Sequence, residues 1–152
     1  MRFSPGTSGN RRARLTETRR RYELLFGLLL NSVLRISEAL ALKAPDVRIL
    51  EGATKSVRGF IGKGDKQRLV PLPEAFGAVF GGWLEDRPRG EFVFARATGQ
   101  PPVTPQAARA YLRGMLRKAG IEKKISPHEL RHYSACRIMP NLGVQAGGAL
   151  AW

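Results

Sequence analysis

The segment from Leu15 to Asn31 constrains the fold most, because it carries a regular apolar face. Apolar residues recur there at the spacing i, i+3, i+4 and i+7, namely Tyr22, Leu25, Phe26 and Leu29. This period predicts a helix with one buried side, capped by Thr16 and ending near Asn31. The arginines Arg19, Arg20 and Arg21 are then expected mostly on its solvent side. The fold must therefore build a core around this helix.

The charge of the chain predicts the class of its partner. The 152 residues suit one compact domain, with a 43% hydrophobic and 25% charged content that is ordinary for a globular protein. Lys and Arg number 26 against 12 Asp and Glu, a formal net charge of +14. A polyanion is therefore expected, with nucleic acid the first candidate and an anionic membrane surface the second. The longest apolar run, Leu24–Leu30, is far shorter than the roughly 20 residues that span a bilayer, so no transmembrane segment is expected.

The cysteine content and the N-terminal sequence favour a cytoplasmic protein. Cys136 is the one cysteine of the chain, so it can form no intramolecular disulfide, and we expect it to be a buried small side chain. The arginines near the N-terminus are not followed by an apolar signal core. We therefore expect the chain to work in the cytoplasm.

A short helix and a β region are expected after the first helix. The helix runs from Ile36 to Leu42 and is stopped by Pro45 and Asp46. Short segments rich in β-branched and apolar residues follow, separated by turn sequences: Val47–Leu50, Ser56–Ile61 and Arg68–Leu72. They predict a three-stranded antiparallel sheet.

Helical patterns return after the sheet. One helix is expected between Pro73 and Arg87, followed by a Gly- and Pro-rich loop over residues 89–102 with a short strand at Phe92–Phe94. Thr104 caps the next helix, which ends at Gly120. A capping box of Ser126, Pro127 and Glu129 begins the last helix, whose pattern fails after Met139.

A basic stripe lies on the helix that Thr104 begins. Arg109, Arg113 and Arg117 are spaced at i, i+4 and i+8 and therefore share one face. Such a stripe suits a helix that lies along DNA phosphates or in a major groove. It is equally typical of a solvated charged face, so the spacing alone leaves both interpretations open.

Three segments resemble the tyrosine recombinases of the phage integrase family. Leu34–Leu40 (LRISEAL) is similar to the box around the family's first catalytic arginine, and Ser126–His132 (SPHELRH) is similar to its His-x-x-Arg box. Between them, Gly62–Leu72 (GKGDKQRLVPL) looks like the family's lysine hairpin. Three boxes in the right order are far more specific than any one of them. The resemblance implies an α+β fold: the mostly helical DNA breaking-rejoining catalytic domain, with a small three-stranded antiparallel sheet.

The resemblance also implies roles for four residues. Arg35 and Arg131 would clamp the scissile phosphate with paired hydrogen bonds that strengthen as charge builds up in the transition state. Lys63 would donate the proton to the leaving 5′ oxygen, and His128 would assist proton transfer. Taken one at a time, each residue has a solvent-exposed or structural role as its competing interpretation. Only the set of four favours catalysis.

Neighbouring polar residues are expected in supporting roles. Lys66 and Arg68 would contact backbone phosphates of the DNA. His132 lies four residues after His128, and we expect it to be buried and satisfied by backbone groups. A metal site formed by the two histidines is rejected, because no acidic residue or cysteine completes it. We expect no metal and no cofactor.

The chain departs from the family's pattern at two places. Val33 stands where the family usually has a glycine, two residues before its first arginine, so this turn is expected to be strained or rebuilt. In the family a further His or Trp follows the second arginine, and the nucleophilic tyrosine comes shortly after it. Trp152 is the candidate for the His or Trp position. None of Tyr22, Tyr111 and Tyr133 suits the nucleophile, so we expect no nucleophile and no cleavage of DNA by this chain alone.

We therefore divide the chain into a basic flexible arm (residues 1–14), an integrase-like catalytic domain (15–143) and an atypical tail (144–152). The expected function is that of a DNA-binding, recombinase-like domain for DNA integration and recombination. One alternative is a non-catalytic regulatory module that occupies recombination sites, and another is a basic RNA- or ribosome-associated protein. Double-stranded DNA is the expected partner, other recombinase protomers are a further candidate, and a membrane is not expected.

Overall fold

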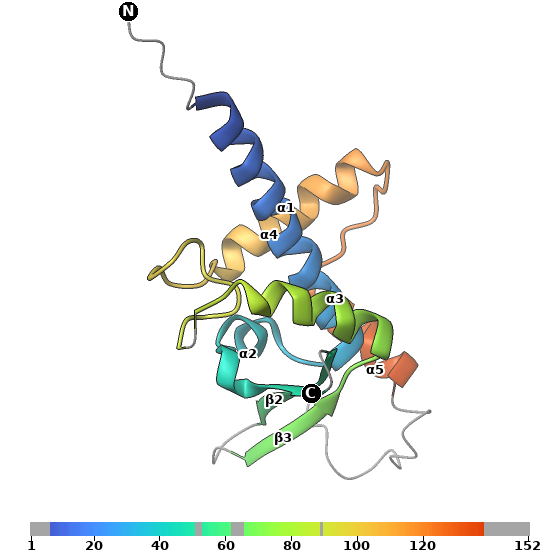
Figure 1. Cartoon of the computed structure of the whole chain (residues 1–152). Coiled ribbons are helices and arrows are strands. Elements are labelled where there is room, and N and C mark those ends of the chain that lie inside the picture. The colour runs from blue at the N-terminus through green and yellow to red at the C-terminus, as the bar shows by residue number, and fades with distance from the viewer. Residues whose placement is uncertain (1–6, 51–52, 62–65, 89, 139–152) are drawn as a thin grey trace, which may run out of the picture.

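The protein is described here by a computed structural model that covers residues 7–50, 53–61, 66–88 and 90–138. Its elements are, in chain order, α1 (Thr7–Ser32), α2 (Ile36–Leu40), the 3-10 helix η1 (Ala44–Asp46), β1 (Val47–Leu50), β2 (Ala53–Ile61), β3 (Lys66–Pro71), α3 (Glu74–Glu85), α4 (Pro105–Lys118) and α5 (Pro127–Ile138). Figure 1 shows α1 running down the middle of the molecule, with the small sheet beyond its C-terminal end. The expected α+β fold, mostly helical with one small sheet, is confirmed.

The first helix begins earlier than its apolar pattern predicted. It starts at Thr7, so residues 7–14, which we had assigned to a flexible arm, are helical. The expected cap at Thr16 is wrong, because Thr16 lies inside the helix and its hydroxyl donates to the carbonyl of Arg12 at 2.9 Å. The side chains of residues 11–17 are exposed. Apolar periodicity cannot detect a helical turn whose whole circumference faces solvent.

The apolar face of α1 is the centre of the core, as predicted. Leu25, Leu28 and Leu29 have no exposed surface, and each buried leucine contributes about 1.5–3 kcal/mol through the removal of apolar area from water. The core is completed by side chains from α2, α3, α4 and α5 and from the segment between α3 and α4, including Leu40, Phe80, Trp83, Leu84, Phe94, Val103, Ala108, Leu112 and Ala135.

The sheet has the predicted topology. Its strand order is β1-β2-β3, and both pairs are antiparallel. Val57 of β2 lies opposite both Val47 of β1 and Val70 of β3. Helix α3 packs against β2, which is visible in Figure 1. Residues 62–65, which connect β2 to β3 and include Lys63, lie outside the described residues.

The expected loop between α3 and α4 is confirmed, and it is held at several points. The strand expected at Phe92–Phe94 is reduced to one isolated bridge between Phe92 and Lys43, and a second bridge joins Ala95 to Pro102. Val93 and Phe94 are fully buried. The loop ends at the predicted cap, where the Thr104 hydroxyl accepts a hydrogen bond from the Ala107 amide at 3.1 Å. In the part of the chain described here, no helix is both long and apolar enough to cross a membrane.

Candidate active site

The first predicted arginine sits at the start of a helix. Arg35 is the N-cap residue of α2, with an extended backbone, and its amide donates to the Glu38 carboxylate at 2.7 Å. This bond satisfies one of the amides that a helix start leaves without an intrahelical partner. The side chain of Arg35 is exposed. The backbone is therefore fixed while the guanidinium can reach a ligand.

The turn before Arg35 is strained, as the valine at this position predicted. Val33 has φ of 56° and is the one residue other than glycine with positive φ in the described chain. A β-branched residue in this left-handed region costs about 1–2 kcal/mol. The turn is held from α5 on both sides: the Val33 amide donates to the Ser134 hydroxyl at 3.2 Å, and its carbonyl accepts from Arg131 Nε at 3.0 Å.

The second predicted arginine is thereby tied to the first. Arg131 is 4% exposed, and its Nε donates a hydrogen bond to the carbonyl of Val33, two residues before Arg35. The helix that carries it begins with the predicted capping box, in which the Ser126 amide donates to Glu129 and the Glu129 amide donates to the Ser126 hydroxyl. Two boxes nearly a hundred residues apart in sequence thus share one hydrogen-bonded turn.

A pocket of about 440 Å³ joins these elements, and we call it the Arg131 pocket. It is lined by residues of α2, α4 and α5 and of the segments that begin them: Arg35, Ile36, Ser37, Arg109, Ser126, Pro127, His128 and Arg131. Three of the four predicted catalytic residues are in this lining, together with Arg109 from the predicted basic stripe. Three guanidinium groups and no carboxylate are among the described residues that line it. The pocket is therefore suited to an anion.

The remaining predicted site residues lie elsewhere. Lys63 and Trp152 fall outside the described residues. Lys66 and Arg68 are at the start of β3, paired with Ile61 and Gly59 of β2. The stripe on α4 divides between two hollows: Arg109 lines the Arg131 pocket, whereas Arg113 and Arg117 line a second hollow of about 520 Å³ with the segment 120–124. All three arginines of the stripe are exposed.

Two expectations for α5 are wrong. His132 and Cys136 were expected to be buried, and both are exposed. The buried face of α5 is formed by Arg131, Ser134 and Ala135, which follow the i, i+3, i+4 spacing of a helix that packs against α1. His132 and Cys136 occupy the other side of the helix.

Sequence reasoning also missed buried polar groups, among them Arg21 and Ser134. Arg21, expected on the solvent side of α1, is 5% exposed, and Ser134 is fully buried. Both could have been found from helical spacing: Arg21 lies four residues before the core residue Leu25, and Ser134 lies three residues after Arg131.

Comparison with known proteins finds similarity over most of the chain. Residues 12–146 match the phage integrase family. The tyrosine recombinase XerD of Listeria monocytogenes is 35% identical over 129 residues, which cover 80% of this chain and 42% of the relative. The tyrosine recombinase XerA of Pyrococcus furiosus is 34% identical over 122 residues, which cover 78% of this chain and 41% of the relative. The chain thus spans less than half the length of these relatives.

Solved structures share the fold. The crystal structure of XerA recombinase superimposes with a TM-score of 0.67 at 27% identity, covering 95% of this chain and 54% of the other. The structure of the XerH site-specific recombinase bound to its difH substrate, a pre-cleavage complex, has a TM-score of 0.63 at 25% identity and covers 93% of this chain and 38% of the other. The similarity to both extends over nearly the whole chain.

Proposed function

Since the chain belongs to the phage integrase family, we propose that it binds double-stranded DNA and holds a backbone phosphate in the Arg131 pocket. The observation that carries this proposal is the meeting of Arg35, His128 and Arg131 in one pocket, from segments nearly a hundred residues apart. The net charge of +14 supports a polyanionic partner. A domain that acts on DNA in this way would work in the cytoplasm.

The two arginines would act as a phosphate clamp. The bond from Arg131 Nε to the Val33 carbonyl fixes the guanidinium group in the pocket. We assign Arg131 to the non-bridging oxygens of the phosphate, and Arg35 would approach from the exposed side. Their hydrogen bonds would strengthen as negative charge builds up on the phosphate in the transition state. We assign proton donation to the leaving oxygen to Lys63 and assistance of proton transfer to His128.

The other basic residues would position the duplex. Lys66 and Arg68, at the start of β3, would contact backbone phosphates. The stripe of Arg109, Arg113 and Arg117 would extend along the DNA from the Arg131 pocket. Phosphate contacts of this kind set the position and orientation of a protein on a duplex without reading its sequence.

We further propose that the 152-residue chain does not cleave DNA by itself. Tyr22 is buried and stacked on Tyr111 with ring centroids 4.0 Å apart. Tyr133 follows Arg131 by two residues on α5, and residues at this spacing do not share a helix face. The Arg131 pocket has no tyrosine among its described lining residues. Trp152 would stand at the family's His or Trp position, and a nucleophile would have to come from outside these 152 residues.

Binding is tested by substitution of the exposed arginine in the pocket. Loss of Arg35 in R35Q removes charge-assisted hydrogen bonds worth about 1.5–3 kcal/mol, so the affinity for a duplex should fall by about tenfold or more. R137Q removes the same charge from an exposed position of α5 outside the pocket, and its affinity should stay within about twofold of that of the parent chain. Fluorescence anisotropy at low salt measures both. Equal losses in the two variants would argue against the clamp.

The absence of a nucleophile is tested with a nicked suicide duplex, which traps covalent protein–DNA adducts. We expect no adduct with the purified chain at any duplex concentration. Any denaturation-resistant adduct would refute the proposal. The variant Y133F would then show whether Tyr133 is the attacking residue. Stable binding without any adduct is also what a regulatory module that occupies recombination sites would show.

A further inference from the structure

A further pocket, larger than the Arg131 pocket, lies along α1 on the N-terminal side of the residues that lead into Val33. It has a volume of about 870 Å³ and is formed by the N-terminal half of α1, the C-terminal end of α3 and residues 96–98. We call it the Arg21 pocket. It shares no described lining residue with the Arg131 pocket. Arg21 and Ser32, the last residue of α1, are 11 positions apart on this helix, which corresponds to about 16 Å.

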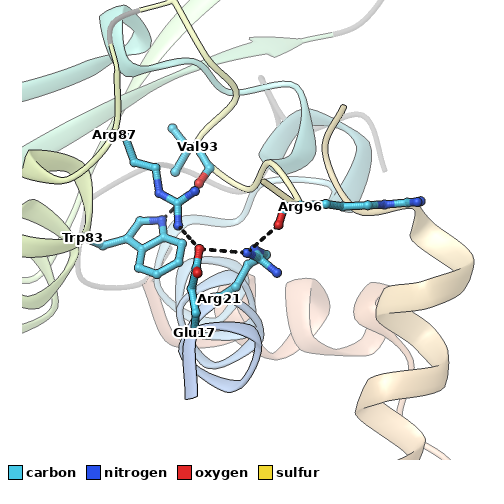
Figure 2. A network of polar contacts seen from close by, with 6 residues as sticks. All are labelled: Glu17, Arg21, Trp83, Arg87, Val93 and Arg96. Carbon is cyan, nitrogen blue, oxygen red and sulfur yellow. Dashed lines mark hydrogen bonds and ion pairs between the residues drawn. The ribbon is translucent and has the colours of Figure 1, made fainter. Parts of the chain in front are cut away.

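The Arg21 pocket contains two buried arginines that share one carboxylate. Figure 2 shows Glu17 between them: its Oε1 accepts from Arg21 Nη2 at 3.1 Å and from Arg87 Nη2 at 3.0 Å. The side chains of Arg21 and Arg87 are only 6% and 9% exposed. One carboxylate cannot neutralise two guanidinium groups, so the buried part of the pocket keeps an uncompensated positive charge.

The hydrogen-bonding capacity of the two arginines is also incomplete. Arg21 donates to the Arg96 carbonyl at 3.0 Å in addition to Glu17. The Nε groups of Arg21 and Arg87 are buried and have no hydrogen-bond partner in the described chain. Buried donors of this kind are costly unless they are paired. Burial lowers the pKa of Arg21, a shift that Glu17 opposes and the charge of Arg87 increases.

The walls of the pocket reinforce its charge. The Arg87 guanidinium lies 3.9 Å from the centroid of the Trp83 ring, and Arg20 approaches the same ring at 5.8 Å. Trp83 itself is fixed by a hydrogen bond from its indole nitrogen to the Val93 carbonyl at 3.0 Å. The described lining contains five arginines (Arg14, Arg20, Arg21, Arg87 and Arg96) and two carboxylates (Glu17 and Asp86).

We propose that the Arg21 pocket is a binding site for a phosphate group, separate from the DNA clamp. Guanidinium groups pair with phosphate and carboxylate alike, but the pocket has an excess of three positive charges. A phosphate monoester carries about 1.5–2 negative charges at neutral pH, whereas a carboxylate carries one, so a phosphate compensates this excess better. The phosphate belongs either to a free phosphate compound or to the backbone of bound DNA.

The test uses inorganic phosphate as the probe and Trp83 as the reporter. The chain has two tryptophans, so W152F leaves Trp83 as the single indole, in the wall of the pocket. Titration with phosphate at constant ionic strength should give a saturable change in Trp83 fluorescence. R35Q should give the same change, because Arg35 lies in the other pocket. Loss of DNA binding in R35Q therefore leaves this readout intact, and the two proposals can fail independently.

Matched charge variants locate the site. R14Q/R20Q removes two exposed arginines from the rim, and the affinity for phosphate should fall by about tenfold or more. R19Q/R137Q removes two exposed arginines outside the pocket and should change it by less than about twofold. The proposal is wrong if phosphate gives no saturable response, if both variants weaken it equally, or if only an acidic peptide gives a response.

A duplex titration distinguishes the two sources of phosphate. If the phosphate comes from DNA, R14Q/R20Q should weaken duplex binding more than R19Q/R137Q, and inorganic phosphate and the duplex should compete at Trp83. If it comes from a free compound, the two double variants should bind the duplex equally while only R14Q/R20Q loses phosphate. Both results support a phosphate site in the Arg21 pocket.

Discussion

At the scale of single residues, Val33 determines how the two predicted arginines meet. Its positive φ turns the chain from α1 into α2, and α5 binds both its amide and its carbonyl. The strain of about 1–2 kcal/mol is tolerated because the surrounding structure fixes this backbone conformation. The buried Val33 side chain, 6% exposed, offsets part of that cost through its apolar burial.

This geometry predicts an unusual order of stability at position 33. Both V33A and V33G lose buried methyl groups, but only V33G also relieves the left-handed strain, so V33G should be the more stable of the two. Val79, 55% exposed inside α3, provides the control, where V79A should be more stable than V79G by about 1 kcal/mol. Urea unfolding measures all four. The same order at both positions would contradict the strained turn.

Tyr22 predicts a loss of stability at high pH. Burial raises its pKa, while Arg21 and Arg96 oppose the rise. A group whose folded-state pKa is raised contributes stability that is present below its unfolded pKa of about 10 and is lost as the pH rises through the folded-state value.

Thermal unfolding between about pH 9 and 11 checks this prediction. Y22F should lose less stability than the parent chain over this range, because it has no phenol to ionise in the core. Y133F, which removes an exposed phenol, should behave like the parent chain. If stability fell with pH as steeply in Y22F as in the parent chain, burial of the Tyr22 phenol would not be the cause of the loss at high pH.

At the scale of elements, the contact of α1 with α3 depends on a glycine. A Cβ built on Gly27 would lie 2.7 Å from Cε2 of Phe76, whereas one built on Gly114 of α4 meets no atom within 4 Å. Alanine is more favourable than glycine inside a helix by about 1 kcal/mol, and overpacking costs about 1–3 kcal/mol.

The two glycines should therefore respond with opposite signs. G114A should stabilise the chain by up to about 1 kcal/mol, and G27A should be neutral or destabilising, because the Phe76 ring must move. Chemical denaturation of both variants gives the comparison. A gain in G27A as large as that in G114A would show that Phe76 moves at no cost.

At the scale of the whole molecule, Glu17 connects elements that are distant in sequence. Its carboxylate joins Arg21 of α1 to Arg87 after α3, and Arg21 continues the network to the Arg96 carbonyl. Glu17 is about half exposed, which weakens its interactions, but both of its partners are buried. The network therefore differs from the exposed pair of Arg19 and Glu23, with side chains 75% and 45% exposed.

E17Q should lower the free energy of unfolding by about 1–2 kcal/mol, because two buried guanidinium groups lose their shared counter-charge. E23Q should change it by less than about 0.5 kcal/mol. If the Arg21 pocket binds phosphate, added phosphate should raise the melting temperature of E17Q more than that of the parent chain. Thermal unfolding with and without phosphate measures these effects, and equal losses in E17Q and E23Q would assign no special role to Glu17.

Local sequence signals were enough to predict the five α-helices, the sheet, their order and the identity of the candidate catalytic residues. Amphipathic periods, helix caps and turn residues are local, so the antiparallel sheet, the Thr104 cap and the capping box at Ser126 could be predicted from neighbouring residues. The same local signals could not detect that α1 begins at Thr7, because the exposed residues 11–17 form no apolar face.

Which polar groups are buried, and which of them meet, depends on the packing of the elements. The bond between Arg131 and Val33, the burial of Arg21 and the exposure of His132 and Cys136 are all non-local consequences of helix packing. A charged residue on the edge of an apolar helix face is buried or solvated according to whether another element supplies its partner. For Arg21 that partner network includes the Arg96 carbonyl, 75 residues away.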